Sequence, residues 1–248
     1  MVRIAAVGDL HLTVGVAVRL RPVYQRVVEV ADILLLAGDL TEDGDIESAA
    51  EVCDLFGGLD LPVIAVLGNH DYHRGHEAAF VRMLTGAGVT VLEGTSTVVN
   101  TPGGQIGIAG VKGFGGGFAG HTVAAHGERE MKAFARHSAT TAQALRDALT
   151  QLDVDLRVAL THYAPTRATL AGEPLELYPF LGSHLLGAAI DGEPVTEAVP
   201  VTLALHGHAH YGTEVGETPA GTAVRNVAAR VIGGPFAVYR LPDAVRIG

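Results

Sequence analysis

Five short apolar runs, each followed at once by polar side chains, constrain this 248-residue chain more than any other feature. Each run is rich in Val, Ile, Leu and Ala and has the length of a buried strand. The runs are Val2–Val7, Ile33–Ala37, Val63–Leu67, Arg157–Thr161 and Val201–Leu205. The clusters that follow them are Asp9-Leu10-His11, Gly38-Asp39, Gly68-Asn69-His70-Asp71, His162 and Gly207-His208-Ala209-His210. Because ligands of open α/β sheets bind beyond the carboxyl ends of the strands, we expect all five clusters to converge on one rim.

Segments with helical spacing separate the early runs. Apolar residues recur there at three and four positions, with charged residues between them, in Val16–Val30, Asp45–Phe56 and Gly75–Thr85. The alternation predicts a β-α-β-α-β start and a largely parallel sheet. Further strands, which we expect to form a second and more antiparallel sheet, are Val89–Leu92, Thr97–Val99, Ile106–Val111, Ala223–Val227 and Phe236–Leu241. The longest predicted helix is Glu128–Leu152.

Composition allows residues 1–248 to form one domain of α/β or barrel type, since 48% of the chain is hydrophobic. No stretch of about 18 uncharged apolar residues occurs, so no membrane span is expected. The N-terminal apolar run ends in Gly8-Asp9 rather than at a small-residue cleavage site, which disfavours a secretory signal. The single cysteine, Cys53, cannot form an intrachain disulfide and fits a reducing compartment, so the cytoplasm is the expected location.

The formal net charge of −10 disfavours extended nucleic acid as a partner. A surface of that sign repels the phosphate backbone, which dominates the non-specific affinity of proteins for DNA and RNA. The 32 glycines are spread through turns rather than gathered in one linker, so they mark no domain boundary.

The clusters, in their order, resemble the calcineurin-like metallophosphoesterase superfamily. Its pattern is D-x-H, G-D, G-N-H-[DE], H and G-H-x-H, and the resemblance covers the chain from Asp9 to His210. It implies a four-layer α/β/β/α sandwich of two mixed sheets, with a binuclear metal site at one edge of the sheets. It also implies two ligand sets that share a bridging Asp39. The first set adds Asp9, His11 and His210, and the second adds Asn69, His162 and His208.

The side chains themselves indicate two divalent transition-metal ions. Imidazole nitrogens mixed with carboxylate and amide oxygens suit Mn, Fe, Co, Ni or Zn better than Ca or Mg, which prefer shells of oxygen alone. Mn²⁺ or Fe is the first expectation. Two cations about 3.5–4 Å apart can clamp a phosphate and acidify a water or hydroxide between them. We therefore expect hydrolysis of a small organic phosphodiester or monoester by a hydroxide that bridges the metals.

His70 is left over from the ligand set. The resemblance gives it the role of general acid for the leaving alkoxide, and a protonated imidazole near metals needs an acidic partner. Glu42 stands where phosphoprotein phosphatases of the superfamily place an aspartate that pairs with this histidine, so Glu42 is the expected orienter. Asp71 is the competing candidate. His206 lies inside an apolar run and is expected in the core or behind the ligands.

The loop that carries Glu42 departs from one branch of the superfamily. Phosphoprotein phosphatases read G-D-x-V-D-R-G here, and their arginine contacts phosphate. This chain reads Gly38-Asp39-Leu40-Thr41-Glu42-Asp43-Gly44, with Asp43 in place of that arginine. The resemblance is therefore closer to the bacterial phosphodiesterase branch, and protein phosphatase activity is not expected.

Three further regions could shape the choice of substrate. The glycine-rich segment Gly110–Gly120 makes Lys112 available to a phosphate but matches no nucleotide-binding loop. Residues 164–200, between metal ligands, form a candidate lid or pocket wall. Arg129, Lys132 and Arg136 share a helix face, which is an anion site or simply a solvated face. The remaining histidines are expected at the surface or in pocket walls: His73, His76, His121, His126, His137 and His184.

Two other functions stay open. A nuclease is disfavoured by the acidic charge and by the lack of a basic stripe. A binding or scaffolding protein could keep the same fold without catalysis. A loss of catalysis would show first as a replaced metal ligand or a replaced general acid. The implied metal ligands and His70 are all present in this sequence.

Overall fold

The first of two six-stranded sheets has the order β14-β13-β1-β2-β3-β4 in the computed structural model, which describes residues 1–192 and 200–248. Strands β1 to β4 run parallel, β13 pairs with β1 in the antiparallel direction, and β14 pairs with β13 in the antiparallel direction. The bounds are β1 Val2–Val7, β2 Ile33–Ala37, β3 Val63–Val66, β4 Thr90–Val91, β13 Ala237–Leu241 and β14 Val245–Arg246. The β-α-β-α-β start predicted from the apolar runs is confirmed.

The second sheet has the order β11-β12-β10-β9-β6-β5. Its four central strands are parallel, and only the two edge strands, β5 and β11, are antiparallel to their neighbours. The bounds are β5 Thr95–Thr101, β6 Gly104–Val111, β9 Leu156–Thr161, β10 Leu203–His206, β11 Val215–Glu217 and β12 Ala223–Asn226. A separate pair, β7 Gly117–Phe118 and β8 His121–Thr122, forms a small hairpin.

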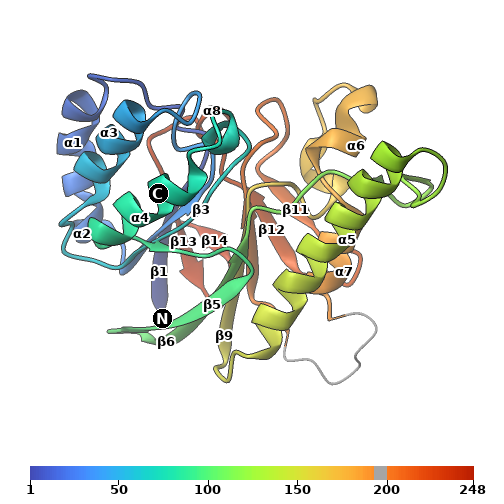
Figure 1. Cartoon of the computed structure of the whole chain (residues 1–248). Coiled ribbons are helices and arrows are strands. Elements are labelled where there is room, and N and C mark those ends of the chain that lie inside the picture. The colour runs from blue at the N-terminus through green and yellow to red at the C-terminus, as the bar shows by residue number, and fades with distance from the viewer. Residues whose placement is uncertain (193–199) are drawn as a thin grey trace.

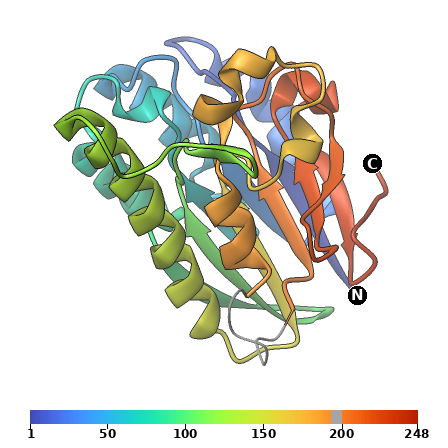
Figure 2. The same ribbon diagram turned by 90° about the vertical axis from the view of Figure 1, so that its right-hand side faces the viewer.

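Helices cover the outer faces of both sheets (Figure 1). The first sheet is covered by α1 Ala17–Gln25, α2 Val27–Val30, α3 Ile46–Phe56 and α4 Glu77–Gly86. The second is covered by α5 Arg129–Thr150 and α7 His184–Ile190 (Figure 2). Strands β2 and β3 contact β6 and β9 across the interior, so the two sheets pack face to face. The architecture is therefore the four-layer α/β/β/α sandwich that the resemblance implies.

Both interfaces of the first sheet are apolar, which explains why its central strands lack a polar alternation. The residues of β2 are all buried, because helices cover one face and the second sheet covers the other. Asp45 caps the N-terminus of helix α3, and its carboxylate accepts a hydrogen bond from the Ser48 amide at 2.7 Å. The helix then buries Val52, Leu55 and Phe56 against the sheet.

Two strand assignments made from the sequence are wrong. Val89–Leu92 and Phe236–Leu241 contain β4 and β13, which belong to the first sheet and not to the second. The expected antiparallel character of the second sheet is also wrong for its centre. Pairing between strands that are distant in the chain leaves no trace in a local apolar pattern. The pattern alone therefore does not tell which sheet a short strand joins.

The helical segments are confirmed with shifted bounds. Val16–Val30 is two helices, because α1 ends at Gln25 and α2 begins at Val27. The described part of 164–200 holds short elements: the 3₁₀ turns η2 Arg167–Leu170 and η3 Leu175–Leu177, then α6 Tyr178–Leu181 and α7. Residues 193–199 of this candidate lid lie outside the described residues. Within the described ranges, no helix is both long and apolar enough for a membrane span.

Candidate metal centre

Backbone hydrogen bonds join the loops that follow the five apolar strands. The amide of Asp9, after β1, donates to the carbonyl of Gly38, after β2, at 2.9 Å. The amide of Gly207, after β10, donates to the carbonyl of His162, after β9, at 3.1 Å. The amide of His208, after β10 of the second sheet, donates to the Asp9 carboxylate, after β1 of the first sheet, at 2.9 Å. The carboxyl ends of strands from both sheets therefore meet at one edge, although the five runs do not share one sheet.

Four of the predicted ligand residues have left-handed backbone angles. This region is costly for residues other than glycine, and it persists where the surrounding structure imposes it, often at functional sites. The residues are Asp9 (φ 58°), His11 (φ 47°), Asp39 (φ 50°) and His208 (φ 68°). The loops are therefore shaped to aim these side chains rather than to follow the easiest path of the chain.

Glycines let the carboxylates approach the neighbouring backbone. A Cβ atom on Gly68 would overlap Oδ1 of Asp39, and one on Gly207 would overlap Oδ2 of Asp9. No side chain fits at either position without displacing a predicted ligand. The glycines of the motifs are thus part of the geometry of the site.

One set of metal-capable side chains is Asp9, His11 and His210, whose donor atoms all lie within 4.8 Å of one another. Nε2 of His210 is 2.8 Å from Oδ1 of Asp9 and 3.5 Å from Nε2 of His11. The Asp9 carboxylate also accepts the His208 amide at 2.9 and 3.0 Å. Three side chains of the predicted first set, one carboxylate and two imidazoles, therefore lie around a common point.

The second set is Asp39, His162 and His208. Nδ1 of the fully buried His162 lies 2.8 Å from the carbonyl oxygen of Ala37, to which it donates. This contact leaves Nε2 as the free nitrogen, 3.3 Å from Oδ2 of Asp39 and 2.9 Å from Oδ1 of Asn69. The tautomer of His162 is therefore set for a ligand role through Nε2.

Asp39 lies between the two sets. Its Oδ1 accepts the backbone amide of His70 at 2.8 Å, which fixes the carboxylate. Its Oδ2 is 3.3 Å from Nε2 of His162 and 3.9 Å from Nε2 of His11. One oxygen of a carboxylate that is only 1% exposed thus faces histidines of both sets.

The charges at this edge are strongly coupled. Burial by itself would lower the pKa of His162, but the Asp39 carboxylate raises that pKa to about 9. Burial would raise the pKa of Asp39, and the His162 charge with its hydrogen bond holds that pKa below its usual range. Burial, together with the His162 charge, lowers the pKa of His208 to about 3. The buried carboxylates thus favour positive charge at this edge, and a donor set of carboxylates and imidazoles fits divalent metal ions.

His70 lies beside these sets and contacts Glu42 in an unexpected way. Nδ1 of His70 bonds to the backbone carbonyl of Glu42, whereas the Glu42 carboxylate lies 3.3 Å from Nδ1 of His11. The expected pairing through the carboxylate is therefore not the contact that the structure shows. Asp71 does not reach His70 either, because it is fully buried and accepts the amides of Leu40, Thr41 and Gly68.

The other histidines lie as expected. His206 is fully buried, and its Nε2 is 2.8 Å from the hydroxyl of Thr169. His184 is partly buried and bonds to the carbonyl of Gly117 at 3.1 Å. The exposed histidines are His73, His76, His121, His126 and His137. On α5, Arg129 and Arg136 are exposed and Lys132 is partly exposed, which describes a solvated face.

Comparison with known families agrees with this geometry. The family model for calcineurin-like phosphoesterases matches residues 2–212. This chain belongs to the calcineurin-like phosphoesterase family. No curated protein matches the sequence well enough to count as a relative.

Solved structures share the fold of this calcineurin-like phosphoesterase at low identity. The phosphopantetheinyl hydrolase PptH from Mycobacterium tuberculosis superposes with a TM-score of 0.64 and 18% identity, covering 91% of this chain and 88% of that one. GAP50, the anchor in the inner membrane complex of Plasmodium, superposes with a TM-score of 0.56 and 13% identity, covering 96% and 80%. At these identities the likeness concerns the fold alone.

Two neighbours of the candidate centre in this calcineurin-like phosphoesterase were not among the predicted site residues. The ring of Tyr163 is 4.3 Å from the ring of His208, centroid to centroid. The carbonyl of Phe180, in α6, lies 3.3 Å from Nε2 of His208. Tyr163 directly follows a predicted ligand, and Phe180 belongs to the segment predicted to be a pocket wall. Asp43, in the loop 38–44 after β2, pairs with Arg74, and the distance from Nε to Oδ2 is 3.1 Å. Among the described residues, Arg74 is the only arginine whose side chain bonds to this loop.

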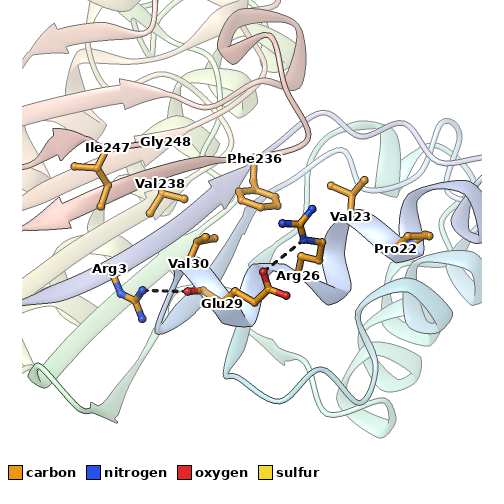
Figure 3. Close-up of a pocket in the computed structure, with 10 residues that line it drawn as sticks. All are labelled: Arg3, Pro22, Val23, Arg26, Glu29, Val30, Phe236, Val238, Ile247 and Gly248. Atoms are coloured by element: carbon orange, nitrogen blue, oxygen red, sulfur yellow. Dashed lines mark hydrogen bonds and ion pairs between the residues drawn. The ribbon is translucent and has the colours of Figure 1, made fainter.

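A cavity of about 630 Å³ lies away from the candidate centre (Figure 3). Its apolar wall comes from the region of α1, α2 and β13, namely Val23, Val30, Phe236, Val238 and Ile247. Arg3 and Arg26 line it as well, and both bond to Glu29. None of the predicted ligands lines this cavity, so this family member has its metal-capable edge and its apolar cavity in different places.

Proposed function

We propose that this protein is a binuclear metal-dependent phosphoesterase that hydrolyses a small organic phosphodiester or monoester. The observation that carries the proposal is the position of Asp39, whose Oδ2 faces His162 of one set and His11 of the other. A carboxylate oxygen between two groups of nitrogen donors is what a bridged pair of cations requires.

The proposed ligands form two sets that share Asp39. Asp9, His11 and His210 hold one ion, and Asn69, His162 and His208 hold the other. When bound, two cations such as Mn²⁺ or Fe clamp the phosphate, acidify the attacking water and stabilise charge on the entering and leaving oxygens. The mixed nitrogen and oxygen donors favour transition metals, including Zn²⁺, Co²⁺ and Ni²⁺, over Ca²⁺ or Mg²⁺.

His70 is the proposed general acid. Donation of its Nδ1 hydrogen to the Glu42 carbonyl leaves Nε2 to carry the proton for the leaving oxygen. In this account Glu42 orients His70 through its backbone, and its carboxylate turns instead to His11. Asp71 has a structural role, because its carboxylate is used up by buried amides and the Thr41 hydroxyl.

Residues 1–248 form one metallophosphoesterase domain in this proposal, with 164–200 as its substrate-facing insertion. Two observations on the described part of the insertion support this role. The carbonyl of Phe180 holds Nε2 of His208. A cavity of about 360 Å³ also lies between the insertion and the β7–β8 hairpin, lined in part by Phe118, Arg167 and Tyr178.

The acidic charge and the unpaired Cys53 support a small substrate and a cytoplasmic setting rather than action on extended nucleic acid. The name of the Mycobacterium neighbour adds phosphopantetheinyl esters to the compounds worth assaying, although the two chains share only 18% identity. A panel of monoesters and diesters therefore tests substrate class directly.

The test is reconstitution of the purified protein with Mn²⁺, followed by assays with bis-p-nitrophenyl phosphate and p-nitrophenyl phosphate. We expect hydrolysis of at least one ester that depends on added metal and is abolished by a chelator. Stable metal binding without hydrolysis of any ester in the panel would contradict the catalytic role. Folded protein that binds no metal would favour a scaffolding role. The Plasmodium neighbour GAP50 is described by its name as an anchor.

A further inference from the structure

Lysine is rare in this chain, and one of its two lysines stands beside the candidate metal centre. The sequence holds 17 lysines and arginines, of which only Lys112 and Lys132 are lysines. Lys132 lies on the solvated face of α5. Lys112 follows the end of β6 directly, and its carbonyl accepts the amides of both His162 and Tyr163 at 3.0 and 3.1 Å.

The ammonium group of Lys112 is enclosed by three aromatic rings. Nζ lies 5.0 Å from the ring centroid of Tyr72, and 5.3 Å from those of Phe114 and Tyr163. Cation–π contacts of this kind attract a cation and hold it in place. Tyr163 is the same ring that lies 4.3 Å from His208, so about one aromatic ring separates the ammonium from a proposed metal ligand.

The ammonium has no anionic partner in the part of the chain that the structure describes. Its side-chain hydrogen bond is a long one, 3.4 Å to the carbonyl of Gly113, and it takes part in no ion pair there. The carboxylates of Glu93 and Asp39 lie close enough for their charges to act on it. Once divalent cations neutralise Asp39, Lys112 faces a site of net positive charge, which leaves its own charge open to an anion from outside the protein.

We propose that Lys112 and its ring of Tyr72, Phe114 and Tyr163 form a subsite for a second anionic group of the substrate, a phosphate or a carboxylate beyond the phosphate that is hydrolysed. This inference rests on the proposed function and narrows its substrate class to esters with such a second anion. The cage holds the ammonium close enough to Asp39 for the two charges to interact, and a lysine supplies a compact point charge there. Arg74, the arginine bonded to the loop of Asp39, is already paired with Asp43.

Binding measurements on the metal-reconstituted full chain test the subsite with three probes. Ethyl phosphate carries one anionic group, phosphoglycolate adds a carboxylate, and 1,3-propanediol bisphosphate adds a phosphate. Calorimetry is expected to show at least one of the two longer probes binding about ten-fold tighter than ethyl phosphate, and the tighter one identifies the group. In Lys112→Met this ratio falls to near one, Lys112→Arg recovers part of it, and Lys132→Met keeps the wild-type ratio. Equal binding of all probes by the wild type, or an unchanged ratio in Lys112→Met, overturns the proposal.

A second readout does not depend on turnover. Reductive ¹³C-methylation labels two lysines and the N-terminus, so the Zn²⁺-loaded protein gives few signals, which Lys112→Met and Lys132→Met assign. We expect the Lys112 signal to shift with the preferred longer probe and the Lys132 signal to stay in place. If metal and ethyl phosphate bind but the Lys112 signal does not shift with any probe, the cation–π contact is structural. That result contradicts the subsite. Hydrolysis of bis-p-nitrophenyl phosphate and metal content, measured on the same preparation, separate this result from a failure of the proposed function.

Discussion

The two ends of the first sheet carry opposite kinds of polar chemistry. At the amino end, Arg3 in β1 bonds to Asp32 at 2.7 Å and to the Glu29 carbonyl, so the charges at this end have local partners. At the carboxyl end, Asp9 and Asp39 are buried among histidines that compete for the same few oxygens. Locally paired charge indicates a structural role, whereas buried carboxylates and imidazoles that converge on one point are typical of a functional site.

The backbone shows the same contrast. All four left-handed residues other than glycine within the motifs lie at the carboxyl end, and glycines there make room for carboxylates rather than for turns alone. The fifth such residue, Ala244 (φ 53°), lies in the turn between β13 and β14, and the wall of the apolar cavity beside α1 and β13 contains none (Figure 3). Strain is thus concentrated where the proposed chemistry is, and matched substitutions at the two ends should have very different effects.

The largest difference is expected between Asp39→Asn and Asp32→Asn. The first removes the proposed bridging carboxylate and should weaken metal binding by more than about a hundred-fold and abolish hydrolysis. The second breaks a partly exposed ion pair with Arg3 and should cost about 1 kcal/mol or less. Metal titration, ester hydrolysis and thermal unfolding of both variants measure the contrast, and equal metal affinity in the two would remove the special status of Asp39.

His70→Asn should lower kcat by about a hundred-fold or more on an ester with an alkyl leaving group. The effect on a p-nitrophenyl ester should be much smaller, because that leaving group departs without a proton. Metal content should stay at the wild-type level. His76→Asn, at an exposed histidine nearby, is the control. The same loss on both kinds of ester would show that His70 is not the acid.

Gly68→Ala should destabilise the protein by about 2 kcal/mol or more, since the added methyl group overlaps Oδ1 of Asp39. Gly86→Ala is the matched control, because a Cβ at this helical glycine meets open space and alanine favours helix. Chemical unfolding with and without metal measures both. A Gly68→Ala protein as stable as wild type, with normal metal binding, would show that close packing at Asp39 does not matter.

Metal-free and metal-loaded protein should respond to pH in opposite directions. The pKa of His162 is raised to about 9 in the metal-free state, so its pairing with Asp39 stabilises that state fully below about pH 6.5. This contribution is lost as pH rises through about 9. Metal must displace the proton, so metal affinity should rise with pH, about ten-fold per unit for each proton released. Unfolding curves and metal titrations between pH 6 and 9 test the trend, and a metal affinity independent of pH would contradict it.

The convergence of the candidate ligands on one edge could be predicted from the sequence, because their loops follow buried strands and parallel strands end at a common edge. Glu42 shows the limit of that reasoning. Its position in the loop suggested a carboxylate contact with His70, but the loop turns its carbonyl to His70 and its carboxylate to His11. The conformation of this loop depends on contacts such as the hydrogen bond from the Glu42 amide to the Leu12 carbonyl, and motif spacing does not reveal such contacts.

Tertiary pairing limited the fold prediction in the same way. β13 joins β1 although more than two hundred residues separate them, and no local pattern announces such a partner. The aromatic cage is a second case. Its three rings come from segments far apart in the chain, and only their packing around Lys112 makes them one group: Tyr72, Phe114 and Tyr163.

The central claim is that two cations share Asp39, and anomalous diffraction from crystals grown with Mn²⁺ tests it most directly. The account predicts two Mn²⁺ peaks on either side of Oδ2 of Asp39, one beside Asp9, His11 and His210, and one beside Asn69, His162 and His208. A single peak, or peaks that do not contact Asp39, would contradict it.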